Sequence, residues 1–434
     1  MRSWGHLRPG VRFSTGRPLE ARAVVFSVQR VIALNKPPAF LFKDIAGLHE
    51  ASVRAPDTRT VEFTLPKSSS PQAFLSILAF SVGGVVDPDE VASHQSGQDR
   101  GEAWLRDHSA GTGPYVVERW EPESQVVLVA NPNYWGPRPR ISRIVIRHVP
   151  ESSNQKFMLE RADADIANDL TPEQARELGN RPGVRIQRGR TLLLVYVGMN
   201  VGHKPLDNPK VREAVRWSID YDGIVQGLLR GNAQKVQTII PAGLFGHNPA
   251  TSFRQDSSRA RQLLVEAGFP DGFSVELLTP TGAAPGGVNW ADLGAKLQAD
   301  LGKSGIRVTV RQTTQAELLN VYRAQKGQMV LILWGPDFPD PDGNVTPFTD
   351  YEAKSIAWRN QYRDEALARL AKQAALETNP DRRRALYRQI TEKVLHEGPY
   401  AVLYQPTLVL GVRSDVRGFV WNPMGYAEFR TVTK

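Results

Sequence analysis

The feature that most constrains the fold is a run of six apolar residues, 329–334, which ends abruptly in a segment of prolines and acids. An unbroken apolar run of this length is typical of a strand buried on both faces of a parallel sheet. Residues 335–342 hold turn formers and three aspartates, so the chain is expected to leave the sheet there. Because open α/β sheets bind ligands at the carboxyl ends of strands, these three aspartates predict contact with a cationic ligand group, with Trp334 and Phe338 as stacking surfaces. A solvated acidic loop is the alternative, and this segment alone leaves both open.

Helix and strand patterns alternate over residues 260–333, which predicts an α/β fold with right-handed crossovers and a mainly parallel sheet there. Two further helices carry clear start signals, an asparagine cap followed by proline, at Asn208-Pro209 and Asn379-Pro380. A strand predicted at residues 401–410 contains Pro406, so it should be an edge strand or a segment that crosses between sheets. The first third of the chain reads as strand-rich and irregular.

Length and composition exclude several classes of protein. With 434 residues the chain is long enough for two domains. Its 54 basic and 45 acidic residues give a net charge of +9, but the basic residues are scattered, whereas a nucleic-acid binder would show a basic stripe interleaved with aromatic residues. The absence of cysteine excludes disulfides, thiolate-bound zinc, iron–sulfur clusters and thiol nucleophiles.

No apolar stretch approaches the ~18–20 residues that a transmembrane helix needs. The first thirty residues do not form a signal peptide either, because five arginines between Arg2 and Arg22 leave no room for an apolar core. Taken literally, the chain as given is expected not to be exported.

The sequence lacks the motifs of an enzyme. Its eight histidines are isolated, and neither a phosphate-binding loop nor a nucleophile motif is present. Asp340 and Asp342 could serve acid–base chemistry, yet nothing beside them supplies the rest of a site. We therefore expect no catalytic residues, no metal ligands and no cofactor. A large α/β protein with an acidic, aromatic loop at a strand end is typical of a binding protein, with an enzyme that uses these carboxylates as the weaker alternative.

Five ordered segments resemble the substrate-binding proteins of peptide- and nickel-type ABC transporters, the dipeptide/oligopeptide class of solute-binding family 5. They cover nearly the whole chain and are Leu7-Arg8-Pro9-Gly10-Val11-Arg12-Phe13 with Phe26-Ser27, Gly111-Thr112-Gly113-Pro114-Tyr115 with Tyr134-Trp135, Met199-Asn200 with Pro205-Leu206 and Val211-Arg212, Ala267-Gly268-Phe269-Pro270, and Trp334-Gly335-Pro336-Asp337-Phe338-Pro339-Asp340-Pro341. Each is weak alone, whereas the ordered set is specific.

The resemblance implies a two-lobed fold like that of class II periplasmic binding proteins, with mixed sheets in each lobe. Lobe one is expected at residues 1–195 with the returning segment 408–434, and lobe two at 196–407, with a hinge near Tyr196 and Thr407. The implied function is the capture of a peptide or peptide-like solute in the periplasm by a monomer that delivers it to an inner-membrane permease and its ATPase subunits. Opines, nickel chelates and oligosaccharides are alternative solutes within the class.

The resemblance also implies a ligand site. Asp337 sits where the family's dipeptide binders hold the α-ammonium of the ligand, and the other candidate ligand-binding residues are Trp334, Phe338, Asn200 and Trp358.

Two departures from the family pattern stand out. The dipeptide binders clamp the ligand carboxylate with an arginine in the segment that is 281–287 here, which holds neither arginine nor lysine. Members also carry a leader and several strands ahead of the Leu7 segment. The chain as given starts almost at that segment, which implies either a start codon placed too late or a truncated gene. A protein made as written would have an unpaired sheet edge in lobe one.

Overall fold

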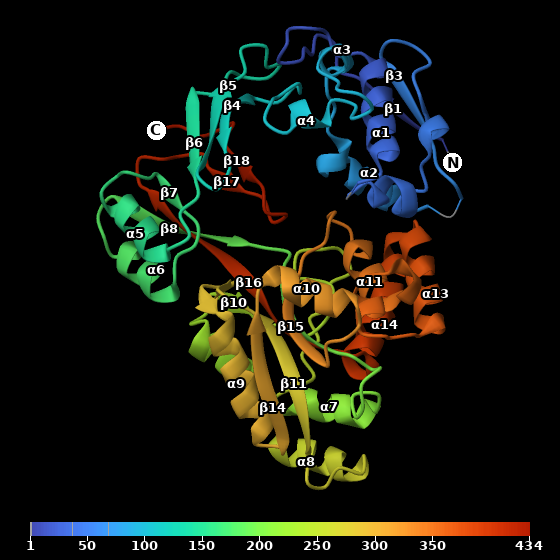
Figure 1. Ribbon diagram of the computed structural model, residues 1–434, viewed down its shortest axis with the longest axis vertical. Helices are drawn as coiled ribbons and strands as arrows, with labels where there is room; N and C mark the ends of the chain where they lie inside the picture. Colours follow the sequence, from blue (N-terminus) through green and yellow to red (C-terminus); the bar gives the residue numbers. More distant parts are fainter. Residues whose placement is uncertain (1, 37, 68) are drawn as a thin grey trace. The chain divides into compact units, whose positions relative to one another are not determined.

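The structure is a computed structural model, and it describes residues 2–36, 38–67 and 69–434. The chain divides into two compact units (Figure 1). Unit 1 comprises residues 1–151, 414–422 and 426–434, and unit 2 comprises residues 152–413 and 423–425. Among the described residues, none of the helices combines the length and the apolar character that crossing a bilayer requires.

Unit 1 contains two three-stranded sheets and a group of short helices. One sheet has the order β1-β3-β2 and the other the order β4-β5-β6, and both are antiparallel. Its elements are β1 (Arg2–His6), α1 (Ala21–Leu34), η1 (Leu41–Ile45), η2 (Glu50–Ser52), β2 (Val53–Arg54), β3 (Thr60–Thr64), α2 (Pro71–Leu78), η3 (Ser81–Gly83), α3 (Pro88–Ser93), α4 (Glu102–Leu105), β4 (Tyr115–Glu121), β5 (Gln125–Ala130), β6 (Arg143–Arg147), β17 (Val420–Trp421) and β18 (Ala427–Glu428).

Helix α1 corrects the expectation of a strand-rich first third. Its sequence is dense in valine and isoleucine, which favour strands when local preference alone is considered. The segment is nevertheless a 14-residue helix, because residues such as Ala23, Ser27 and Val28 bury one face of it. Tertiary packing here outweighs the local preference.

Unit 2 is built on one mixed sheet with the strand order β10-β16-β9-β15-β11-β14, and β7 and β8 pair with β16 beyond this path. Its strands are β7 (Ile166–Ala167), β8 (Val184–Arg190), β9 (Leu194–Met199), β10 (Ala233–Gln234), β11 (Phe273–Pro280), β12 (Ala283–Ala284), β13 (Val288–Asn289), β14 (Ile306–Thr313), β15 (Met329–Trp334) and β16 (Tyr400–Arg413). Its helices are α5 (Ser152–Glu160), α6 (Pro172–Gly179), α7 (Pro209–Ser218), η4 (Gly223–Leu228), α8 (Ser257–Glu266), α9 (Trp290–Gly302), α10 (Gln315–Arg323), α11 (Asp342–Thr349), η5 (Tyr351–Ala353), α12 (Ile356–Arg359), α13 (Glu365–Leu376) and α14 (Pro380–Glu397).

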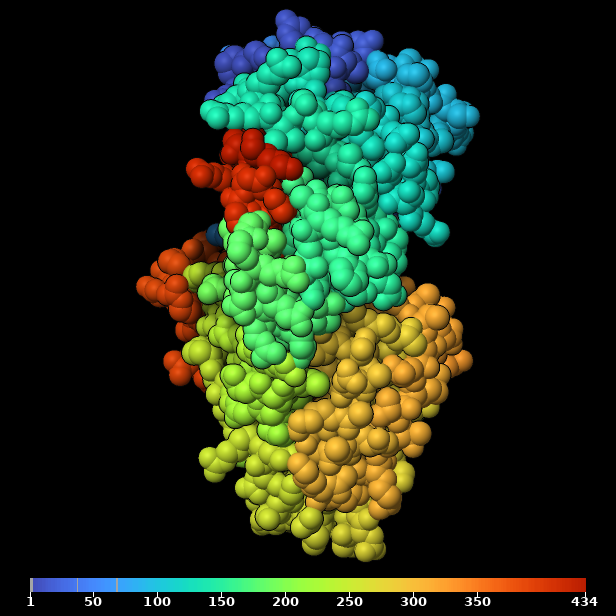
Figure 2. Space-filling view, turned by 90° about the vertical axis from the view of Figure 1, so that its left-hand side faces the viewer, coloured from blue at the N-terminus to red at the C-terminus, as the bar shows by residue number. Residues whose placement is uncertain are grey.

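Strands β14, β11 and β15 are parallel, as the alternating pattern of residues 260–333 predicts. The other neighbours on the path are antiparallel: β15 with β9, β9 with β16, and β16 with β10. The sheet of unit 2 is therefore mixed, and its apolar core lies on both faces. Helix α8 forms the end of unit 2 that is drawn lowest in Figure 1 and again in Figure 2.

Strand β16 explains why unit 2 starts earlier than the predicted lobe boundary. Its first half pairs with β9 and β10, and its second half, from Thr407, pairs with β8 and β7. Pro406 lies where the pairing changes, so the segment crosses between two groups of strands as its proline predicts. Because one continuous strand joins these groups, residues 152–190 pack with unit 2, and the division falls near 151 and 413 rather than near 195 and 407. Tyr196 and Thr407 both lie inside unit 2 by this division.

Candidate functional site

The loop that follows β15 holds one carboxylate without a partner. The chain leaves the sheet after Trp334 and enters α11 at Asp342. Within it, Asp337 is half-buried, and its side chain has neither a hydrogen bond nor an ion pair within the described residues. Burial raises the pKa of Asp337 above its usual range. A carboxylate in this condition gains stability from a cation brought beside it.

The two other aspartates of this segment already bind side chains of the protein, so fewer of the three predicted acids are available to a ligand. Asp340 is buried and accepts two hydrogen bonds from the guanidinium of Arg383, at 2.8 and 2.9 Å. Asp342 is buried and accepts a hydrogen bond from the hydroxyl of Thr346 at 2.6 Å. Only Asp337 is therefore free to meet a ligand, and the reading of all three acids as ligand groups is corrected.

Hydrogen bonds from two side chains hold the Asp337 loop in place. The indole Nε1 of Trp334 donates to the carbonyl of Gly343 at 3.2 Å, which ties the last residue of β15 to the first turn of α11. The amide of Asn344 donates to the carbonyl of Ile239 at 2.7 Å. These bonds fix both flanks of the loop before any ligand arrives, and such preorganisation lowers the ordering cost of binding.

The aromatic residues predicted as stacking surfaces differ in exposure. Trp334 is half-buried, and its ring meets Phe348 edge-on with centroids 6.3 Å apart. Phe338 is only 3% exposed, so its ring packs into unit 2 and offers little surface. Stacking of either ring on a ligand stays a prediction.

Asn200 has no hydrogen-bonding capacity left for a ligand. Its side chain is 1% exposed. The amide nitrogen donates to the carbonyls of Gln325 and Gly327 at 2.9 and 3.0 Å. The amide oxygen accepts from the backbone of Gly202 at 3.0 Å and from the side chain of Gln361 at 3.1 Å. All four bonding positions of this amide join loops of unit 2, which is a structural role.

The five candidate residues fall into two groups at opposite ends of β15. Asn200 follows β9, and its backbone N–H donates to the carbonyl of Gln328, just before β15 begins, whereas Asp337 follows the end of β15. Six strand residues span roughly 17–20 Å at about 3.3 Å each. Trp358 belongs to the Asn200 end, because its carbonyl accepts a hydrogen bond from Gln325 at 2.7 Å. The structure thus brings Trp334, Asp337 and Phe338 together and separates them from the other two.

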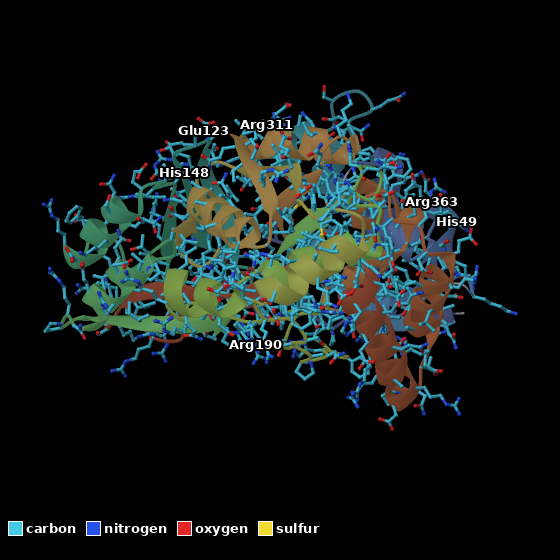
Figure 3. The ribbon with its side chains drawn as sticks, turned by 90° about the horizontal axis from the view of Figure 1, so that it is seen from below. His49, Glu123, His148, Arg190, Arg311 and Arg363 are labelled. Carbon is cyan, nitrogen blue, oxygen red and sulfur yellow. The ribbon has the colours of Figure 1, made fainter. Side chains whose placement is uncertain are left out.

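Trp358 instead belongs to a cluster of rings and cations. Its ring lies 4.7 Å from that of Tyr351. The ammonium of Lys354 lies 3.7 Å above the Trp358 ring, and the guanidinium of Arg363 lies 3.7 Å from the Tyr351 ring. The side chain of Arg363, which is labelled in Figure 3, is 65% exposed. A hollow of about 270 Å³ adjoins Tyr351 and Arg363. Its charged groups already have ion-pair partners, for example Asp350 with Lys372 and Glu365 with Arg369.

The segment of residues 281–287, which holds neither arginine nor lysine, lies at the same edge of the sheet as the Asp337 loop. Strand β11 is parallel to β15, so residues 281–287, which follow β11, lie at the same edge of the sheet. They form the small hairpin β12–β13, and the hydroxyl of Tyr404 donates to the carbonyl of Pro285 at 2.9 Å. The edge thus offers an anion at Asp337 and no cation in the hairpin.

A chain with this sheet and this loop is similar to one group of known proteins. The model of the family described as "Bacterial extracellular solute-binding proteins, family 5 Middle" matches residues 5–355, which is most of the chain. The chain belongs to this family. The resemblance found in the five sequence segments is confirmed.

Curated relatives of this family 5 protein are similar over nearly its whole length. The probable D,D-dipeptide-binding periplasmic protein DdpA of Escherichia coli K12 is 29% identical over 423 residues, which cover 96% of this chain and 79% of the relative. Di/tripeptide-binding protein 4 of Pseudomonas aeruginosa UCBPP-PA14 is 30% identical over 451 residues, covering 99% and 83%. Both relatives are named as binding proteins.

Solved structures confirm the class II fold. The periplasmic binding protein DppA of Helicobacter pylori, in complex with the peptide STSA, superposes with a TM-score of 0.83 at 25% identity and covers 99% of this chain and 86% of that one. The dipeptide-binding protein of Pseudoalteromonas sp. SM9913, in complex with Met-Leu, gives a TM-score of 0.85 at 21% identity, covering 100% and 88%.

In this family 5 protein, the sequence analysis did not identify Arg383, the residue that binds Asp340 of the loop. In the sequence, Arg383 is the middle residue of the basic run Arg382-Arg383-Arg384. A signal was present, because Arg383 takes the first position of the stripe that α14 buries, continued by Tyr387, Ile390, Thr391 and Val394. A charged residue within a buried stripe indicates a buried partner.

The described residues contain no cluster of three or more histidine, aspartate or glutamate side chains that could hold a metal ion. The candidate site at the end of β15 comprises the Asp337 carboxylate, its supporting loop and the half-buried ring of Trp334. Such an arrangement can bind and orient a cationic group.

Proposed function

We propose that this protein is the extracytoplasmic solute-binding component of an ABC importer, and that it captures a small peptide through the peptide's α-ammonium group at Asp337. The observation that carries the proposal is the half-buried, unpartnered carboxylate on a preorganised loop at the carboxyl end of β15. The relatives support a peptide ligand, since their names refer to dipeptides and tripeptides. The partners would be a membrane permease and its ATPase subunits, and the compartment would be the periplasm.

The ammonium of a peptide suits this carboxylate for a physical reason. A charge-assisted hydrogen bond in a place that excludes water typically contributes ~1.5–3 kcal/mol net. The loop already holds Asp337 in position, so little of that gain is lost to ordering. The hairpin of residues 281–287 carries no cation, so the opposite end of the peptide would be held differently from the ligand of an arginine-bearing relative.

The test measures calorimetric binding of two dipeptides, L-Met-L-Leu and D-Ala-D-Ala, and of their N-acetylated forms, which lack the ammonium. The wild-type protein should bind a free peptide without turnover and discriminate against its acetylated form. Asp337→Asn should weaken binding of the free peptide by ~2–4 kcal/mol, because the ligand's charge is left unpaired, and should leave binding of the acetylated form unchanged.

The matched control is Asp271→Asn, which neutralises an exposed aspartate of the same unit. It should bind like the wild-type protein. Hydrolysis of a bound peptide that a substitution in the loop abolishes would contradict a binding function. Equal affinity for free and acetylated peptides would contradict the role of Asp337.

A further inference from the structure

The Asp337 loop rests on a buried ion pair. Asp340 is 4% exposed and Arg383, on α14, is 6% exposed. One nitrogen of Arg383 donates to both oxygens of Asp340, at 2.8 and 2.9 Å, and also to the hydroxyl of Tyr387 at 3.1 Å. The Nε of Arg383 donates to the carbonyl of Ala374, at the end of α13, at 3.2 Å. The guanidinium therefore connects two helices to the loop.

Short backbone contacts transmit the position of Asp340 to Asp337. The amide of Asp340 donates to the carbonyl of Phe338 at 2.8 Å, and its carbonyl accepts from Gly343 at 3.0 Å. One oxygen of its carboxylate also accepts the amide of Asp342 at 3.0 Å, which begins α11. Asp337 is the neighbour of Phe338, so a shift of Asp340 moves the backbone that carries the free carboxylate.

A buried ion pair is a poor device for stability alone. Removing two charges from water costs about as much as their attraction returns, and apolar residues of similar size often fold as stably. The pair does, however, favour one geometry of the loop, because the carboxylate of Asp340 is held by Arg383 on one side and by the amide of Asp342 on the other. The carboxylate of Asp337 is partly buried and has no partner among the described residues. A mobile loop would move this carboxylate into water, so the loop must be held in place.

We propose that Arg383 is a positioning residue for the ligand's ammonium group: through Asp340 it holds the Asp337 carboxylate in the partly desolvated place where the ammonium binds. This inference rests on the proposed function. Arg383 does not touch the ligand in this arrangement, and its effect on binding passes entirely through the loop.

The test uses a double variant that removes both charges, Asp340→Asn with Arg383→Met, so that neither charge is left buried and alone. The asparagine keeps an acceptor for the amide that begins α11. Arg384→Met is the matched control, since it removes the next arginine of the same helix, whose side chain is 61% exposed. Hydrogen exchange of residues 335–344 is measured in the ligand-free proteins, together with binding of L-Met-L-Leu and of its N-acetylated form.

In the double variant, amides of the loop should exchange at least about tenfold faster while those of β15 stay as protected as in the wild type, since local opening alone has changed. Binding of the free dipeptide should weaken about tenfold, because the loop must now be ordered on binding. Binding of the acetylated form should not change. Arg384→Met should match the wild type in every measurement.

The outcomes separate the inference from the proposed function. One outcome overturns the inference and leaves the proposed function standing. In it, the wild type binds the free dipeptide more tightly than the acetylated form, Asp337→Asn loses this preference, and the double variant keeps it. Unchanged exchange of the loop in the double variant overturns the inference as well. If the wild type binds neither dipeptide, the proposed function falls, and the inference falls with it.

Discussion

The carboxylate of Asp342 accepts a hydrogen bond from the hydroxyl of Thr346 at 2.6 Å, one turn further along α11. Burial, with the neighbouring charge of Asp340 as a smaller contribution, raises the pKa of Asp342 to about 6. An aspartate in an unfolded chain titrates near pH ~3.9. Between these values the folded protein holds a proton that the unfolded chain has released, so ionisation of Asp342 costs stability as the pH rises through about 6.

The first prediction concerns this residue. Asp342→Asn should raise the free energy of unfolding at pH 7 by about 2 kcal/mol, because the buried charge is removed, and should have little effect near pH 4, where the folded protein already holds the proton. Urea unfolding of both proteins between pH 4 and 7 measures the difference, in which the contributions of other carboxylates cancel. Parallel stability curves would show that Asp342 is not the buried titrating group.

The second prediction links ligand binding to protons. In the free protein the pKa of Asp337 is raised, and an ammonium beside it would lower that pKa, so binding should release a proton at a pH near the free value. Affinity for L-Met-L-Leu should therefore fall as the pH drops through that value. Calorimetry in two buffers of different ionisation enthalpy measures the release, which should vanish in Asp337→Asn. Release that persists in the variant would place the titrating group elsewhere.

The third prediction concerns Gly343, which packs against the Asp337 loop. A methyl group added there would lie 3.0 Å from the carbonyl oxygen of Phe338 and 3.0 Å from Cβ of Pro336, the two residues that flank Asp337. Gly343→Ala should cost about 1–3 kcal/mol of stability through overpacking, and should weaken dipeptide binding because the loop is displaced. Gly302→Ala, on α9 with open space around it, is the control and should be neutral or stabilising. Normal affinity in Gly343→Ala would mean that the loop tolerates the shift.

The fourth prediction concerns the end of α14. Arg216 is 1% exposed and donates to the carbonyls of His396, in the last turn of α14, and of Gly398, the residue after it. Arg216→Met should lower the free energy of unfolding by ~2–4 kcal/mol, because buried carbonyls lose their donors. Arg388→Met, on the exposed face of α14, should change it by less than ~0.5 kcal/mol. Equal effects of the two substitutions would exclude the capping role.

Local signals predicted much of unit 2. Residues 329–334 form β15, and the asparagine–proline pairs at 208–209 and 379–380 begin α7 and α14 with the asparagine side chain as cap. These features depend on a few neighbouring residues, so the sequence states them directly. Helix α1 could not be predicted in the same way, because its four valines and one isoleucine favour a strand when local preference alone is considered.

The site was predictable only where one segment contains it. The structure confirms that β15 ends at Trp334 and that the segment with Asp337 leaves the sheet there. Contact of Asp337 with a ligand stays a prediction. The structural roles of Asp340 and Asn200 depend on Arg383 and Gln325, which bind them from far along the chain. The spacing of residues in the sequence does not predict such contacts. The antiparallel pairing of β9 with β15 sets Asn200 at the opposite end from Asp337, and that pairing is a long-range fact.

The central place of β9 in its sheet bears on how the protein is made. Its two neighbours, β15 and β16, both come from the last quarter of the chain, so β9 leaves the ribosome long before either exists. All six of its residues are buried in the finished sheet, and until then they are an apolar segment with unpaired backbone groups. Pairings over such sequence distances form slowly. While the chain is being made, β9 is therefore an exposed apolar segment that needs protection from aggregation until β15 and β16 have been synthesised.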